Sequence, residues 1–377
     1  METAEKDGRA LFLSATMGAG HQRAAEALAE AFRRLAPAVA TDEIDFFEQL
    51  SPAMNNLIRW MYIVSVRHLP QVWNTFYTGT SRVRPNSAVQ AFLNSLGREK
   101  LLVTVQKAHP KVLINTFPTP AGVVSSLRLA GRLDTPNVSV VTDHTVHSQW
   151  IHPNVDRYYV GSEMVRQGMV ARGVPADRIL ATGIPVHPSF ADPVDAKSVR
   201  ERLGVGSDPV VVLMAGAYGM IGGFAEIIDQ IVTRGPKVTY LALAGHDQAL
   251  AESLKEVASR APNRLVVQGY LEETWDVMRI ADILVSTAGG LTTSEAMACG
   301  LPMAIFRPIP GQEMANVRLV VDEGAGFWAT TVDALVDGLH RFFQAAEERA
   351  QMQQAASRVG RPQAARDIVQ DLLARYF

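Results

Sequence analysis

Two short segments in the second half of the chain combine glycines, hydroxyls and acids in a spacing that suits a sugar diphosphate. Ser286–Glu295 follows an apolar run and enters a helix-compatible stretch through two glycines. Such a turn exposes backbone N–H groups at the positive end of a helix dipole, where a diphosphate can bind without a metal. Glu295 can accept hydrogen bonds from ribose hydroxyls, and Gln312 and Glu313 in Pro310–Asn316 can do the same for a hexose. The alternative is an ordinary α/β protein in which the glycines only form a tight turn before a capped helix.

The first turn of the chain places a histidine in a comparable setting. The apolar run Ala10–Ala15 turns through Gly18 and Gly20 and brings His21 to the start of a helix predicted over Gln22–Leu35. Ligands of open α/β sheets bind at the carboxyl ends of strands, and a helix N-terminus disfavours the imidazolium. The histidine therefore suits a general base that deprotonates a hydroxyl. Its alternative role is to cap its own helix, while an NAD site is disfavoured because the turn lacks the dinucleotide spacing.

The elements that must position these residues are short β-branched runs alternating with helical patterns, which predicts two doubly wound α/β domains with parallel sheets. The strands predicted in the first half are Ala10–Ala15, Val112–Phe117, Val138–Thr142, Tyr158–Gly161 and Ile179–Gly183. Those in the second half are Val210–Ala215, Val238–Ala244, Leu265–Gln268, Ile283–Ser286 and Met303–Phe306.

The domain boundary is expected in Pro188–Asp195, where two prolines and two aspartates interrupt both periodicities. This predicts an N-terminal acceptor-binding domain over residues 1–190 and a C-terminal donor-binding domain over residues 191–377. Arg361–Phe377 has the pattern of an amphipathic helix. We expect this last helix to be able to pack back on the N-terminal domain.

Composition bounds the class of protein. With 377 residues, of which 47% are hydrophobic and 20% charged, the chain can bury two cores. A net charge of −2 and a pI of 6.5 offer no global attraction to nucleic acid. The single Cys299 excludes an internal disulfide. The first nine residues lack an apolar signal core, and no uncharged stretch reaches the roughly 18–20 residues of a membrane span, so we expect a cytoplasmic protein.

Residues 49–98 are basic and aromatic, with five arginines and no Asp or Glu. The stretch Leu57–Leu69 is apolar almost all round, but its arginines make it too charged to cross a bilayer. Basic side chains attract anionic headgroups by about 1 kcal/mol each, and Trp and Tyr favour the headgroup level. We expect docking on an anionic membrane, with a buried helix pair whose arginines reach water as the alternative. The side chains concerned are Arg59, Trp60, Tyr62, Arg67, Trp73 and Tyr77.

Five motifs occur in order at residues 18–28, 141–150, 183–188, 289–295 and 310–316. Together they resemble the diacylglycerol glycosyltransferases, the group of monogalactosyldiacylglycerol synthases and processive diacylglycerol glucosyltransferases. They are also similar to the peptidoglycan enzyme that adds N-acetylglucosamine to a lipid-linked precursor. The resemblance implies the glycosyltransferase B fold (GT-B), in which two Rossmann-like domains face a central cleft. It also implies a UDP-sugar donor, inversion at the anomeric carbon, and neither a catalytic metal nor a cofactor.

Transferred residue by residue, the resemblance makes His21 the base on the acceptor hydroxyl. Asp143, which follows a predicted strand, is the alternative base or the group that orients His21. Glu295 is then expected at the ribose, and Gly269 with Tyr270 beside the uracil. The full set expected at the donor is Gly20, Gly216, Tyr218, Gly269, Tyr270, Gly289, Gly290, Thr292, Thr293, Glu295, Gln312, Glu313 and Asn316. The basic aromatic segment matches the membrane-docking and acceptor-binding region of the family, to which His147 and Trp150 are added.

The implied activity is transfer of glucose or galactose from a UDP-sugar to diacylglycerol at the inner face of the cell membrane. Two other enzymes share the expected fold: a UDP-N-acetylglucosamine transferase with another lipid-linked acceptor, and a UDP-N-acetylhexosamine 2-epimerase. A non-catalytic membrane protein that senses nucleotide sugars is a further alternative. The epimerase has no need of a basic aromatic segment, so vesicle binding separates it from the transferases.

Overall fold

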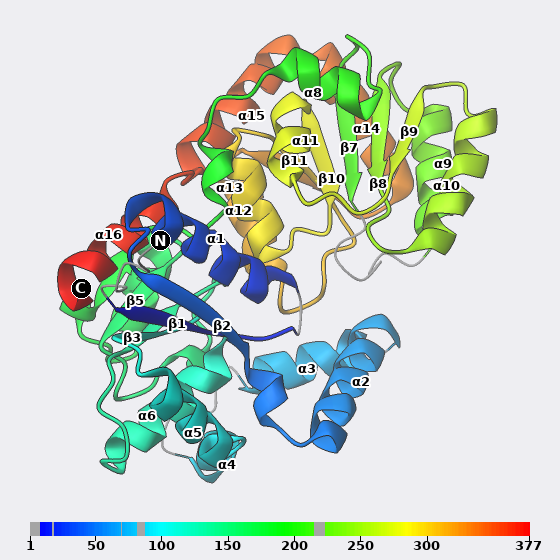
Figure 1. The fold of residues 1–377 in the computed structure, drawn as a ribbon. Helices are drawn as coiled ribbons and strands as arrows, with labels where there is room; N and C mark the ends of the chain where they lie inside the picture. Colours follow the sequence, from blue (N-terminus) through cyan, green and yellow to red (C-terminus); the bar gives the residue numbers. More distant parts are fainter. Residues whose placement is uncertain (1–7, 17–18, 69, 81–86, 215–222) are drawn as a thin grey trace. The chain divides into compact units, whose positions relative to one another are not determined.

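The computed structural model describes residues 8–16, 19–68, 70–80, 87–214 and 223–377. The chain divides into two compact units (Figure 1), and each unit contains one six-stranded parallel sheet. The predicted α/β class with two doubly wound parallel sheets is confirmed. The first unit comprises Met1–Pro188 and Gln363–Phe377, and the second comprises Ser189–Pro362. The last helix therefore belongs to the first unit, although the predicted second domain ran to residue 377.

The sheet of the first unit has the strand order β2-β1-β3-β4-β5-β6. The strands are β1 Arg9–Ser14, β2 Ala40–Asp45, β3 Val112–Asn115, β4 Asn137–Val140, β5 Arg157–Val160 and β6 Ile179–Ala181. The chain runs outward to β2 and then crosses back past β1 to β3. The carboxyl ends of β1 and β3 therefore form a topological switch point, which is where open α/β sheets bind ligands.

Helices cover both faces of this sheet because successive strand residues point to opposite sides. Ala10 and Phe12 pack beneath α1 (Ala19–Leu35) and α16 (Ala364–Tyr376). Leu11 and Leu13 pack on the other face, beneath α5 (Arg98–Ala108) and α6 (Pro118–Leu129). Between β5 and β6 the chain forms α7 (Glu163–Val170).

The C-terminal helix α16 is held to the first unit by a polar network as well as by its apolar face. Asp371 accepts hydrogen bonds from Arg157 Nε at 2.9 Å and from the Tyr159 hydroxyl at 2.7 Å. Phe377 packs edge-on against Phe32 of α1, with ring centroids 5.9 Å apart. These contacts explain why the chain ends on the unit in which it began.

Three helices intervene between β2 and α5: α2 (Pro52–His68), α3 (Pro70–Thr80) and α4 (Ala88–Leu93). The first two pack side by side and lie away from the sheet of the first unit (Figure 1). Among the helices described, none combines the length and apolar character needed to span a bilayer.

The sheet of the second unit has the strand order β12-β11-β10-β7-β8-β9. The strands are β7 Val210–Met214, β8 Thr239–Leu243, β9 Leu265–Gln268, β10 Ile283–Ser286, β11 Met303–Phe306 and β12 Gly326–Ala329. The helices are α8 Ala196–Leu203, α9 Phe224–Arg234, α10 Gln248–Arg260, α11 Thr274–Ile280, α12 Gly290–Ala298, α13 Met314–Asp322, α14 Val332–Gln344 and α15 Ala346–Val359. Here the order reverses between β7 and β10, so the switch point of this unit lies where the glycine pair was predicted to bind a diphosphate.

Candidate functional site

His21 lies in the first turn of α1, directly beyond the end of β1, and its ring is oriented by the two neighbouring strand ends. Its Nδ1 is 2.8 Å from the Thr116 carbonyl oxygen, which follows β3. The same nitrogen is 2.9 Å from the hydroxyl of Thr142, which follows β4. A carbonyl oxygen only accepts hydrogen bonds, so Nδ1 carries the hydrogen of the neutral ring. The lone pair is therefore on Nε2, which can take up a proton.

The surroundings of His21 keep the ring neutral near pH 7. Burial lowers the pKa of His21 below its ordinary value, and the charge of Asp143 and the Thr116 carbonyl offset part of this shift. Phe117 contributes to the burial with its ring edge-on to the imidazole at 5.0 Å. His21 as a whole residue is intermediate in exposure. A neutral imidazole at a switch point fits a general base.

Asp143 lies near His21 but is hydrogen-bonded to another residue. Its Oδ2 accepts a hydrogen bond from the indole Nε1–H of Trp150 at 2.8 Å. Both hydrogen-bonding neighbours of His21 Nδ1 in the described chain are threonines, so Asp143 acts on His21 through its charge. A role for Asp143 as the base itself stays a prediction.

Two residues expected on the acceptor or membrane side lie in the interior. Trp150 is only 1% exposed and His147 is also buried. This burial does not suit direct contact with a lipid headgroup, and the contact with the acceptor expected for the two residues stays a prediction. The sequence analysis did not predict Thr116 at the site. Its position directly after a buried strand that pairs with β1 is the feature that could have identified it.

In the second unit, the turn from β10 into α12 has an unusual backbone. Ala288 adopts φ +76°, a left-handed conformation that costs a non-glycine residue roughly 1 kcal/mol or more. Its carbonyl accepts a hydrogen bond from Asn316 Nδ2 at 2.7 Å. Asn316 is buried, and it holds the turn in its sharp form. The strained turn leads the chain directly into the N-terminus of α12.

Gly289 caps α12 in a conformation that any residue can adopt, with φ −57° and ψ 144°. A Cβ atom built there lies 3.5 Å from Glu313 Oε1 and 3.9 Å from Thr292 Oγ1, which are ordinary contacts. Neither the backbone nor the packing therefore requires glycine at this position. A missing side chain at a helix N-terminus suits a ligand that approaches the backbone closely, as a diphosphate does.

Glu313 braces the same turn from the neighbouring loop. Its Oε1 accepts a hydrogen bond from the Thr287 hydroxyl at 3.1 Å, and its Oε2 accepts one from the Ile309 backbone at 2.7 Å. Burial raises the pKa of Glu313 to about 7. Both oxygens are already in use within the protein, so the expected contact with a sugar stays a prediction. Gln312 Oε1, by contrast, is buried and has no hydrogen-bond donor in the described part of the chain.

The other donor residues on α12 differ in exposure. Gly290 and Thr292 in its first turn are partly exposed, whereas Thr293 and Glu295 are buried. In the first unit, Gly20 lies beside His21 in the first turn of α1 and is partly exposed. The ligand contacts expected for these residues stay predictions.

Gly269 and Tyr270 follow β9, and the ring of Tyr270 forms a flat aromatic surface together with that of His246. Tyr270 is 57% exposed, and its ring stacks on His246 with centroids 4.0 Å apart and planes 15° from parallel. His246 follows β8, so the two rings come from adjacent strand ends. Sequence reasoning missed His246, which its place after a strand and a glycine would have signalled.

Some predicted residues cannot be placed. Gly216 and Tyr218 lie outside the described residues, and so do the side chains of Arg59, Tyr62, Arg67, Trp73 and Tyr77. Trp60 is described and exposed, and it lies on α2 with three further exposed apolar side chains, those of Met54, Leu57 and Met61. We call these four residues the apolar stripe of α2.

Two other features do not contribute to the candidate site. The described residues contain no group of three or more His, Cys, Asp or Glu side chains that could hold a metal ion.

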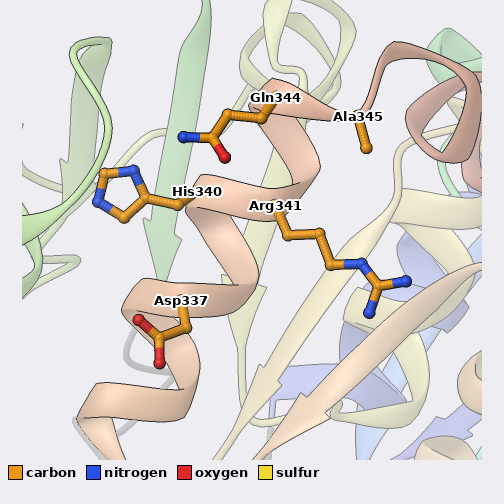
Figure 2. Close-up of a pocket in the computed structure, with 5 residues that line it drawn as sticks. All are labelled: Asp337, His340, Arg341, Gln344 and Ala345. Carbon is orange, nitrogen blue, oxygen red and sulfur yellow. The ribbon is translucent and has the colours of Figure 1, made fainter.

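A surface depression of about 430 Å³ on α14 is shown in Figure 2. It is lined by Asp337, His340, Arg341, Gln344 and Ala345, none of which was predicted at the site. Two of these side chains bind neighbours, His340 the Arg234 carbonyl and Arg341 the Glu348 carboxylate.

Comparisons with known proteins cover both units. The family described as monogalactosyldiacylglycerol (MGDG) synthase matches residues 21–186, and the family described as glycosyl transferases group 1 matches residues 196–359. A processive diacylglycerol beta-glucosyltransferase from Bacillus cereus is 29% identical over 372 residues, which cover 98% of this chain and 94% of that protein.

Solved structures share the fold over nearly the whole chain. MurG from Acinetobacter baumannii superposes with a TM-score of 0.61 at 14% identity, covering 98% of this chain and 100% of that one. Anabaena HepE in complex with UDP-glucose gives a TM-score of 0.56 at 16% identity, covering 97% of this chain and 99% of that one. The predicted GT-B fold is confirmed by these neighbours. The chain thus carries a match to the monogalactosyldiacylglycerol synthase family in its first half and to the glycosyl transferases group 1 in its second half, and it is similar over nearly its whole length to a processive diacylglycerol beta-glucosyltransferase.

Proposed function

We propose that this protein is an inverting glycosyltransferase that moves glucose or galactose from a UDP-sugar to the hydroxyl of diacylglycerol. The observation that carries this proposal is the neutral His21, with its lone pair on Nε2, at the switch point of the first unit. The glycine-lined N-terminus of α12 at the switch point of the second unit supports the donor half. The acceptor is supported by the Bacillus cereus relative, which is named a diacylglycerol beta-glucosyltransferase.

In this proposal the donor is held by the second unit. The diphosphate lies at the N-terminus of α12, where the backbone N–H groups of Gly289 and Gly290 and the helix dipole balance its charge. The uracil lies beside Gly269 and Tyr270. The buried Gln312 Oε1 accepts a hydrogen bond from a hydroxyl of the hexose. The hydroxyl thereby provides the hydrogen-bond partner that this oxygen lacks among the described residues. No cofactor takes part, because the protein's own groups supply the base and stabilise the leaving group.

The transfer is a single displacement. His21 Nε2 takes the proton of the acceptor hydroxyl while the hydroxyl oxygen forms a bond to the anomeric carbon. The bond from that carbon to the β-phosphate oxygen breaks, and UDP leaves with the electron pair. Attack opposite the leaving group inverts the anomeric centre. The charge of Asp143 stabilises the imidazolium that forms, and the amides at α12 stabilise the departing diphosphate.

We further propose that the protein binds peripherally to the cytoplasmic face of the cell membrane through α2. The apolar stripe of α2 supports this, because Trp60, Leu57 and Met61 expose apolar surface on one helix. The arginines of residues 49–98 add attraction for anionic headgroups. Because the whole chain has a net charge of −2, the rest of the chain outside this basic segment is net negative.

The experiment that tests this function supplies diacylglycerol in vesicles containing phosphatidylglycerol, together with labelled UDP-glucose or UDP-galactose. Lipid products are resolved by thin-layer chromatography, with the His21→Ala variant as the control. A glycolipid formed by the wild type alone supports the proposal and identifies the sugar. If neither donor yields a lipid product while UDP still binds, the acceptor assignment is wrong. Conversion of UDP-N-acetylglucosamine to its epimer, in a parallel incubation that supplies this nucleotide sugar, would favour the epimerase alternative.

A further inference from the structure

The 3₁₀ turn η2 (Ser148–Trp150) uses three consecutive side chains to contact three different parts of the first unit. The Ser148 hydroxyl donates to the Thr80 carbonyl at 2.8 Å, at the end of α3. The Gln149 amide donates to Gln90 Oε1 at 2.7 Å, within α4. The Trp150 indole donates to Asp143 Oδ2 at 2.8 Å. One turn therefore contacts α3, α4 and the carboxylate whose charge acts on the candidate base.

The third of these contacts fixes a charge beside His21. The indole ring of Trp150 is buried and lies 6.5 Å from the His21 ring, centroid to centroid. Its packing leaves it little freedom, so its N–H holds the carboxylate of Asp143 in one orientation. The remaining neighbours of His21 described above are uncharged: the Thr116 carbonyl, the Thr142 hydroxyl and the Phe117 ring. Asp143 is thus the charged group that can stabilise an imidazolium at His21.

We infer that Trp150 is a positioning residue for the transfer reaction: it holds the Asp143 carboxylate where its charge favours proton uptake by His21, and η2 links this placement to α3 and α4. The inference rests on the proposed role of His21 as the base. It gives Trp150 a task inside the protein, which the sequence, with its expectation of an acceptor or membrane role, did not predict.

The link to the helices is built from buried polar groups. Gln90 is only 2% exposed, and its side-chain amide donates onward to Asn94 Oδ1 at 2.9 Å. His147 caps η2 by accepting from the Gln149 backbone at 3.3 Å, and its Nε2 lies 3.4 Å from the Thr80 hydroxyl. A shift of the α3 end relative to the sheet would therefore move η2, and with it the indole that holds Asp143. Since α3 packs beside α2, the apolar stripe of α2 is connected to the base through this turn.

The first test measures the pKa of His21 directly, by NMR titration of histidine-labelled protein without substrates. The His21 signal is assigned by its absence from the His21→Gln variant. Asp143→Asn removes the charge, and we expect it to lower the pKa of His21. Trp150→Phe keeps an aromatic ring but removes the donor, which frees the carboxylate to turn away and shifts the pKa of His21 in the same direction. Trp275→Phe in the second unit is the matched control and should leave this pKa unchanged.

The double variant Trp150→Phe with Asp143→Asn decides whether the indole acts through the carboxylate. If it does, the double variant has the same His21 pKa as Asp143→Asn alone. An unchanged pKa in Trp150→Phe, or shifts that simply add in the double variant, would overturn the inference. Because this readout needs no turnover, it separates failure of the positioning role from failure of the proposed function.

The second test uses the transfer reaction and the link to α4. In Trp150→Phe, we expect kcat to fall about tenfold, less than the roughly 10²–10⁴-fold loss that removal of a general base brings. The low-pH limb of the kcat/KM profile should move to lower pH, with KM for the UDP-sugar unchanged. Gln149→Leu keeps the indole but breaks the contact with Gln90 that anchors η2, so the indole is held less firmly and the His21 pKa should shift in the same direction by a smaller amount. An unchanged His21 pKa in Gln149→Leu would overturn the link to α4.

Discussion

Replacing Gly289 with alanine should weaken UDP binding without unfolding the protein. The backbone angles at this position, φ −57° and ψ 144°, are open to alanine, and the new Cβ would meet Glu313 Oε1 at 3.5 Å. Alanine lowers the entropy of the unfolded chain, which stabilises a protein by about 0.4–1 kcal/mol at a compatible site. It is also a poorer helix cap than glycine, which costs a similar amount. The free energy of unfolding should therefore stay within about 1 kcal/mol of the wild-type value.

The effect on binding is expected to be larger. A diphosphate that approaches the bare backbone would meet the new methyl group, and overpacking of one methyl costs about 1–3 kcal/mol. This corresponds to a Kd for UDP that is about 5- to 150-fold higher. Titration calorimetry with UDP measures the change in affinity, and urea denaturation measures the change in stability.

Gly206→Ala is the matched control, because it adds a methyl group in the same unit where the nearest neighbour is Arg264 Nη1 at 3.7 Å. It should leave the affinity for UDP unchanged. Wild-type UDP affinity in Gly289→Ala would refute the reasoning, because it would mean that no ligand approaches this backbone. Loss of several kcal/mol of stability would refute it in another way, because glycine would then be required by the fold itself.

Three further predictions follow from the structure. His21→Ala should lower kcat by roughly 10²–10⁴-fold with the Kd for UDP unchanged, as measured by turnover and calorimetry, since His21 is proposed to act on the acceptor. Burial lowers the pKa of His152 from 6.5 to about 4. As the pH falls, His152 therefore takes up a proton in the unfolded chain before it does so in the folded protein. This difference should lower the free energy of unfolding by about 2 kcal/mol at pH 5. In urea denaturation at pH 7 and pH 5, His152→Gln should lose less stability than the wild type over that interval; equal losses would contradict this reading. Trp60→Ser should weaken binding to anionic vesicles about tenfold in flotation, while Met164→Ser, equally exposed on α7, should not; equal loss in both would argue against docking through α2.

The buried strands were predictable because each is a continuous apolar run, which a parallel sheet covered on both faces requires. The two strands missed by sequence reasoning, β2 and β12, lie at sheet edges and pair on one side only. The polar β2 pairs with β1 alone, and its acids are satisfied by side chains of that neighbour: Glu43 accepts from the Ser14 hydroxyl at 2.5 Å. A strand of this composition has no local signature that separates it from a loop, because its partners lie about thirty residues away in sequence.

The sequence alone determined which residue types stand at the two switch points, since His21 and Gly289 both follow apolar strands at the start of helices. How these residues are held was decided by contacts distant in the chain. The Thr116 carbonyl, 95 positions from His21, selects the ring nitrogen that carries the hydrogen. The Thr142 hydroxyl, 121 positions away, lies beside the same nitrogen, and Glu313 accepts a hydrogen bond from Thr287 in the turn before Gly289. Local periodicity encodes strands and helices, whereas hydrogen-bond partners depend on which strand ends the sheet order brings together, and only the tertiary structure supplies that order.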